Sequence, residues 1–148
     1  MKVRLLLAKS AEVQSNLLYV LGGGWTAIGP GPVAFALVVT IEVGWDETSR
    51  KHKLEIVFED ADGPPILVPG PAGDQPLRLQ AGFEAGRPPG SPPGSSFILP
   101  LAIPIGPVPF PPGRQCVVKA LINGVVLDEL FFSSRPTPLG PVQVTPSP

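Results

Sequence analysis

Apolar and polar residues alternate with a period of two along much of the chain, which is the pattern of strands that bury one face. Leu54, Ile56 and Phe58 alternate with charged neighbours, and the stretch 77–84 repeats the pattern. Other short apolar runs are bounded by glycine and proline, as strands commonly are. The sequence therefore predicts eight or nine strands, at 3–8, 17–21, 33–45, 53–59, 66–68, 77–84, 97–105, 115–122 and 125–132.

The run 33–45 differs from the others because both of its faces are largely apolar. One face begins with Phe35, Leu37 and Val39, and the alternate face carries alanines and Val38 before it becomes polar. A strand that is buried on both sides reads as a nearly continuous apolar run. We therefore expect this run to be a central strand of a sheet.

The stretch 97–105 carries Pro100 and Pro104 on one side and large apolar residues on the other. Proline has no amide hydrogen to donate, so within sheets it is confined to edge strands and bulges. Prolines at an edge also discourage unwanted strand addition. We expect an edge strand or cover strip here, with Pro100 and Pro104 at an interaction surface.

The clearest turn signal is Asn123-Gly124 between two apolar runs, because both residues accept the positive φ angles of a tight hairpin. Asp62-Gly63 marks a second turn. Helical spacing is missing, and residues 10–14 allow one helical turn at most. These features predict an all-β, antiparallel, two-sheet β-sandwich, immunoglobulin-like or C2-like, with a small β-barrel as the alternative.

The domain organisation follows from where proline and glycine gather. Residues 1–134 are expected to form a single sandwich domain that carries a Pro/Gly-rich loop at 86–95, and residues 135–148 a proline-rich extended tail. Within the tail, Val142 and Val144 show a trace of strand alternation. A loosely held tail is the favoured interpretation, and the alternatives are an arm that lies on its own sandwich or one that reaches a neighbouring subunit.

Composition and charge narrow the classes of function. The 148 residues carry a formal net charge of −1 without a basic stripe, so no nucleic-acid partner is expected. No apolar run approaches the roughly 20 residues that span a bilayer, so no membrane span is expected. Cys116 is the single cysteine, which excludes an internal disulfide. A cytoplasmic location is the resulting expectation.

Single residues that could carry chemistry have little support around them. His52 is the one histidine and lies in a charged stretch, where a solvated position is expected, and Cys116 falls on a strand as a small buried hydrophobe. Gly22-Gly23-Gly24 resembles a phosphate loop, but Gly29-Pro30-Gly31-Pro32 follows where such a loop needs a helix, so a structural role is favoured. These glycines predict a bulge or bend, with Trp25 closing one end of the core.

Carboxylates cluster at two loops and are weak candidates for a metal site. Asp60 and Asp62 flank the second turn, and Asp46 and Glu47 follow Trp45. Calcium needs six to eight oxygen ligands, which this set does not supply, so a solvated turn is the favoured interpretation. We expect no catalytic residues, no bound metal and no cofactor.

Two stretches resemble a family of small bacterial proteins classed as a domain of unknown function. They are Ala11-Glu12-Val13 with Leu18-Tyr19-Val20-Leu21-Gly22-Gly23-Gly24-Trp25, and Val43-Gly44-Trp45-Asp46-Glu47-Thr48 with His52. Members are similar in size and in carrying a later Asp-Gly turn and a closing hairpin. The resemblance implies no activity, and the loop 86–95 and the tail depart from its pattern.

The sequence leaves three hypotheses of function. The first is a non-enzymatic protein for protein–protein interaction or self-assembly, which contacts a partner or a second copy through the edge strand and the tail. The alternative is a module that binds a carbohydrate, a lipid or Ca²⁺ and uses Trp25, Trp45 or the acidic loops. An enzyme is third, and would have to centre on His52 with Asp46 or Glu47.

Overall fold

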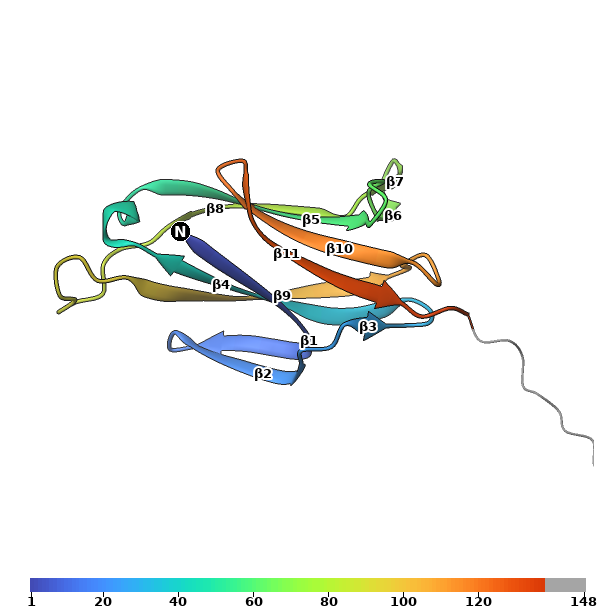
Figure 1. The fold of residues 1–148 in the computed structure, drawn as a ribbon, viewed down its shortest axis with the longest axis horizontal. Coiled ribbons are helices and arrows are strands. Elements are labelled where there is room, and N and C mark those ends of the chain that lie inside the picture. Colours follow the sequence, from blue (N-terminus) through green and yellow to red (C-terminus); the bar gives the residue numbers. More distant parts are fainter. Residues whose placement is uncertain (138–148) are drawn as a thin grey trace, which may run out of the picture.

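The computed structural model describes residues 1–137 as two β-sheets packed face to face, with no closed barrel (Figure 1). Sheet A has the strand order β2 (Leu17–Gly23), β1 (Lys2–Gln14), β4 (Val33–Val43), β9 (Phe97–Val108). Sheet B has the order β3 (Ala27–Ile28), β11 (Val125–Ser134), β10 (Gln115–Ile122), β5 (Lys51–Asp60), β8 (Arg78–Glu84). A separate ribbon pairs β6 (Leu67–Gly70) with β7 (Gly73–Pro76), and η1 (Trp45–Glu47) is a single 3₁₀ turn.

The predicted all-β sandwich is confirmed, and every expected strand is present. The short strands β3 and β7 were not expected, and β3 pairs with β11 in parallel while the other named pairs are antiparallel. The expectation for residues 10–14 was wrong, because they continue β1. Trp45 lies in η1 and not in the preceding strand. The immunoglobulin-like or C2-like strand order stays a prediction.

The core lies between the sheets and is built by the strict alternation of β4. Leu37, Val39 and Ile41 are each 0% exposed, and β4 is paired on both sides, by β1 and β9. The prediction of a central strand is therefore confirmed. At one end of the core a cluster of aromatic rings joins the two sheets, with centroids 5.3 to 6.5 Å apart: Trp25, Phe35, Phe58, Phe110 and Phe132.

The first strand, β1, changes its hydrogen-bonding partner near Ala8. Up to Ala8 it pairs with β4, and from Ala8 onward it pairs with β2. β2 contacts β9, although β1 and β4 separate those strands in the hydrogen-bonded order. The β1–β2 hairpin therefore folds back across the outer face of sheet A, as Figure 1 shows in light blue.

This fold-back gives sheet A a second buried layer. Ala36 and Val38 point away from the main core, yet they are 4% and 2% exposed. Ala11 and Val13 of β1, which pair with Val20 and Leu18 in the hairpin, are half buried and lie on the hairpin face that turns toward sheet A. The apolar second face of the run 33–45 is explained by this cover.

The change of partner leaves the first half of β1 without a strand on one side, and sheet B covers that edge. The amide N–H of Leu5 donates a hydrogen bond of 2.9 Å to the Asp128 carboxylate of β11. A register shift beside Leu127 makes β11 irregular at this point. A side-chain oxygen thus takes the place of a neighbouring strand's carbonyl, so this backbone donor is satisfied.

The tail residues Val142 and Val144 lie outside the described residues. Within residues 1–137, no helix is long and apolar enough to cross a membrane.

Candidate functional site

The outer face of β2 carries a row of exposed apolar side chains. Leu17, Tyr19 and Leu21 are 59%, 52% and 66% exposed. They share one face because they alternate along the strand, and they lie opposite Gln14, Glu12 and Ser10 of β1. Leu18 and Val20 lie on the other face of the strand, which turns toward sheet A, where Leu18 is half buried and Val20 is 38% exposed. The hairpin is therefore apolar on both of its β2 faces, and the face with Leu17, Tyr19 and Leu21 is the more exposed of the two.

β2 is also an edge with free backbone groups. The connecting residues Ser15 and Asn16 have φ of 50° and 60°, which makes a two-residue turn that closes on Gln14 and Leu17. Because hydrogen-bonded and non-bonded pairs alternate in an antiparallel ladder, Tyr19 and Leu21 point their backbone groups at β1. The N–H and C=O of Leu18 and Val20 therefore point to the free edge.

Among the described residues, the other outer edges of sheets A and B are protected against strand addition. β9 carries Pro100 opposite Thr40 and Pro104 opposite Ala36, and a proline in an edge strand removes a donor from its free side. Pro100 is buried and Pro104 is exposed. β8 begins and ends with charged residues, and β3 has two residues. β2 has neither a charge nor a proline.

A hollow of about 570 Å³ follows this hairpin. Its lining comes only from the hairpin's two strands: Ser10, Ala11, Glu12, Leu18, Tyr19, Val20 and Leu21. Glu12 supplies the one charge among them. The hollow is thus a mostly uncharged surface that continues the exposed row along β2.

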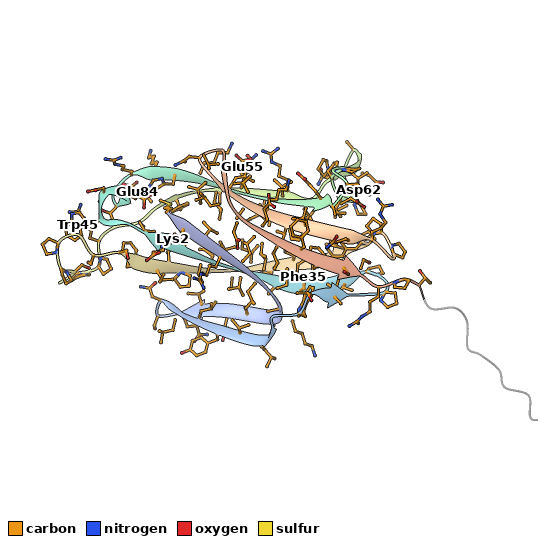
Figure 2. The ribbon with its side chains drawn as sticks, in the orientation of Figure 1. Lys2, Phe35, Trp45, Glu55, Asp62 and Glu84 are labelled. Atoms are coloured by element: carbon orange, nitrogen blue, oxygen red, sulfur yellow. The ribbon has the colours of Figure 1, made fainter. Side chains whose placement is uncertain are left out.

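The outer face of sheet B contrasts with this surface. Glu55 makes ion pairs with Arg78 and with Lys53, the latter at 3.4 Å, and Lys119 pairs with Glu59 at 3.1 Å. These pairs cover the outer face of sheet B around Glu55, which Figure 2 labels. Around Glu55, which is itself buried, this face carries paired charges, which offer little to an apolar partner.

The four carboxylates considered for a metal do not meet. Trp45, next to Asp46 and Glu47, lies at the opposite end of the sandwich from Asp62 (Figure 2). Glu47 accepts hydrogen bonds of 2.9 Å from the N-terminal ammonium and from the amide of Gly44, and the ammonium is the main cause of its lowered pKa. No group of three or more His, Cys, Asp or Glu side chains within residues 1–137 is arranged to hold a metal ion.

Asp60 and Asp62 are tied to one arginine. Arg114 donates to both oxygens of Asp60 at 2.9 and 3.0 Å and to Asp62 at 3.1 Å. These bonds hold the pKa of Asp60 below its ordinary value. Asp60 is buried, contrary to the solvated turn that the sequence favoured, and its partner comes from 54 residues further along the chain.

His52 and Cys116 are held in structural roles. His52 is half buried, with Nε2 at 2.8 Å from the Glu47 carbonyl and Nδ1 at 3.1 Å from the Asn123 amide. Since a carbonyl only accepts, Nε2 carries the proton and Nδ1 accepts from Asn123. Cys116 is 0% exposed as expected, and burial raises the pKa of its thiol to about 11. A thiol in that state is a poor nucleophile.

Sequence reasoning placed the interaction surface on β9 and the tail and missed the row on β2. A signal was present, because residues 17–21 read Leu-Leu-Tyr-Val-Leu, apolar at every position on a strand of ordinary length. A strand of this kind is either buried on both faces or paired at an interface.

The family model that matches the chain is described as a family of unknown function (DUF6941), and the match covers residues 4–133. No curated protein and no solved structure gives a significant match. The match confirms the expected membership of an uncharacterised family and brings no activity, ligand or partner with it.

Proposed function

We propose, for a chain that belongs to the DUF6941 family and takes no known activity from it, a non-enzymatic role in self-assembly. In this proposal the β2 edge pairs with β2 of a second copy. The observation that carries it is the coincidence of exposed apolar side chains and free backbone groups on one unprotected strand. Either feature alone is common on monomers, whereas together they form a template for strand addition.

A second copy is the favoured occupant because the strand is complementary to itself. Antiparallel pairing of two identical strands creates a two-fold axis, the commonest symmetry of oligomers. With the axis at Val20, whose N–H and C=O face the edge, Tyr19 of one copy lies opposite Leu21 of the other. Aromatic and branched aliphatic residues are stabilising cross-strand neighbours. Sheet A of each copy then continues into the other, and no charge of β2 opposes another.

The mass of the protein in solution tests the proposal. Sedimentation equilibrium from about 1 to about 100 μM covers the affinities expected of an interface of modest size. We expect a dimer whose dissociation constant lies within or below this concentration range. Tyr19→Lys with Leu21→Lys places two charges of each copy at the pairing and is expected to give a monomer. These side chains are largely exposed, so the fold is retained.

Val125→Lys is the matched control. Val125 is 59% exposed, like Leu17, but lies on the β10–β11 hairpin. We expect this variant to dimerise as the original chain does. An original chain that stays monomeric at the highest concentration contradicts the proposal. So does a dimer that survives the double lysine substitution.

Val20→Pro distinguishes strand pairing from simple stacking of apolar faces. Proline at this position removes an N–H that faces the free edge and leaves the ladder between β1 and β2 intact. Strand pairing predicts weaker dimerisation with the exposed row unchanged. An unchanged dimer assigns the contact to the side chains and refutes edge pairing.

A chain that ends at Thr137 tests the contribution of the tail. If β2 carries the contact, removal of residues 138–148 leaves the dimer unchanged. A dimer that is lost on this truncation, and kept by the double lysine variant, transfers the role to the tail that includes Val142 and Val144.

A further inference from the structure

A second hollow, of about 320 Å³, opens at the end of the sandwich where the chain enters β3 and leaves β11. Its volume is at the lower limit of small-molecule sites. The residues that define its chemistry are Lys9, Trp25, Ile28, Phe35 and Arg135. None of them belongs to the exposed row on β2.

The floor of this hollow is apolar and firmly held. Trp25 is half buried and packs edge-on against Phe35 and Phe132, with centroids 5.8 and 6.5 Å apart. Phe35 and Ile28 are 4% and 5% exposed. The floor is therefore an extension of the packed core, and a floor that is already ordered lowers the entropic cost of binding.

The rim carries two cations. The Arg135 amide donates to the carbonyl of Ile28 at 2.9 Å, and its Nη1 donates to the carbonyl of Gly29 at 3.1 Å. A guanidinium has five N–H donors, so one bond to a carbonyl leaves most of them available. Lys9 runs beside Gly22, where a Cβ would lie only 3.1 Å from the lysine Cβ. The glycine thus leaves room for the lysine stem.

The residues that line the hollow carry a net positive charge. Its lining includes both cations and no carboxylate, although the whole chain has a net charge of −1. Among residues 1–137, neither Lys9 nor Arg135 takes part in an ion pair, whereas the lysines and arginines on the strands of sheet B mostly pair with a carboxylate. Two positive groups over a rigid apolar floor favour a ligand with a flat apolar body and one anionic group.

We infer that this hollow binds a small aromatic organic anion. The aromatic body lies on the floor beside Trp25, and its carboxylate or phosphate receives hydrogen bonds from Lys9 and Arg135. This inference is independent of dimerisation, since the cations and the indole lie outside the proposed strand pairing.

Phenyl phosphate, benzoate and the uncharged benzyl alcohol are suitable probes, read out by the NMR signals of the full-length protein. The indole N–H of Trp25 is distinguished from that of Trp45 with a Trp45→Phe variant. We expect phenyl phosphate or benzoate to shift the Trp25 signal saturably at millimolar concentration or below. The stronger of the two identifies the anionic group. Benzyl alcohol and inorganic phosphate are each expected to bind more weakly.

Lys9→Gln and Arg135→Gln test the two cations. Each is expected to weaken the anionic probe by about tenfold and to leave benzyl alcohol unaffected. Lys2→Gln removes an exposed cation elsewhere on β1 and is the matched control, with no expected change. Equal binding of charged and uncharged probes, or no saturable shift at Trp25, overturns the inference. Equal effects of Lys9→Gln and Lys2→Gln also overturn it, because they indicate long-range charge only.

Discussion

At the scale of single residues, Asp60 is a buried carboxylate with a structural role. It is buried beside Cys116, accepts two hydrogen bonds from Arg114 and also accepts one from the amide of Asp62 at 2.9 Å. Arg114 in turn donates to Asp62, so one guanidinium fixes the turn after β5 against the start of β10. The acidic loop is thereby a structural joint between two strands of sheet B.

Asp60→Asn is expected to lower the thermal midpoint at pH 7, because it removes the charge that Arg114 binds while keeping the size of the side chain. The pKa of Asp60 is lowered from 3.8 in the folded protein, chiefly by Arg114. Its contribution to stability is therefore complete above pH 3.8 and is lost as the pH falls through the lower folded pKa. The difference between the two proteins should shrink over that range in thermal melts from about pH 7 to about pH 2.

Asp62→Asn is the comparison for this prediction. Asp62 accepts from the same arginine, but its side chain is 83% exposed. Exposed pairs contribute little, so a small effect at every pH is expected. If Asp60→Asn and Asp62→Asn lower the thermal midpoint equally, the bidentate pair of Asp60 with Arg114 contributes no more to stability than the exposed pair of Asp62.

At the scale of elements, the β1–β2 hairpin packs closely around Gly23. A Cβ at this position would lie 2.7 Å from Val20 Cγ1 and 3.1 Å from Leu6 Cδ2. Gly23→Ala must therefore displace the Val20 side chain of the same strand, and Leu6 of β1 must give way by a few tenths of an ångström, at an expected cost of about 1–3 kcal/mol. Chemical denaturation measures the cost, and faster proteolysis within residues 9–23 would locate the movement.

Gly82→Ala is the matched control, since Gly82 also lies within a strand but has room for a side chain. A Cβ at Gly82 would lie 3.9 Å from its nearest neighbour, the carbonyl oxygen of His52. This change should be neutral or stabilise the protein by up to about 1 kcal/mol, because alanine restricts the unfolded chain. A Gly23→Ala variant as stable as Gly82→Ala would contradict close packing of the hairpin.

Strands that depend on local pattern could be predicted, and their partners could not. Asn123-Gly124 forms the expected turn, with φ of 51° and 83°, because these two adjacent residue types both adopt positive φ readily. Val38 was recognised as part of a doubly apolar strand, but nothing nearby indicates that a hairpin covers it. Cover of this kind is decided by contacts between distant segments.

The same distinction applies to the candidate sites. Pro100 and Pro104 lack the amide hydrogen that a central strand needs on both sides. The edge position of β9 was therefore predicted correctly from these two residues. The exposure of Leu17, Tyr19 and Leu21 depends on which face of β2 turns to sheet A, and an apolar strand does not specify this. The hollow beside Trp25 needs Lys9 and Arg135, which lie at opposite ends of the chain and share no motif.

At the scale of the whole molecule, the aromatic cluster at one end of the core joins the two sheets. Phe58 of β5 is 0% exposed and contacts Phe35 of sheet A at 6.0 Å between centroids, with Phe132 of its own sheet at 6.3 Å. Trp25 closes the cluster from the segment after Gly24, as the sequence predicted. The Phe58 ring thus connects the two sheets across the core, so we expect its removal to destabilise both sheets.

Phe58→Ala is expected to destabilise the protein by about 3–5 kcal/mol, because the cavity is surrounded by rings that cannot all move inward. Phe58→Leu leaves a smaller cavity and should lose less, which keeps the test informative if the alanine variant does not fold. Phe131→Ala removes the same side chain from a position that is 47% exposed on the outer face of β11. This control should cost about 0.5 kcal/mol.

Urea unfolding of these three variants also tests whether the two sheets unfold together. Dimerisation adds a concentration-dependent term to stability, so all three are compared in the Tyr19→Lys, Leu21→Lys background. One cooperative transition, shifted far more by Phe58→Ala than by Phe131→Ala, is expected if the cluster couples the sheets. Separate transitions for the sheets would show instead that the aromatic cluster does not couple them.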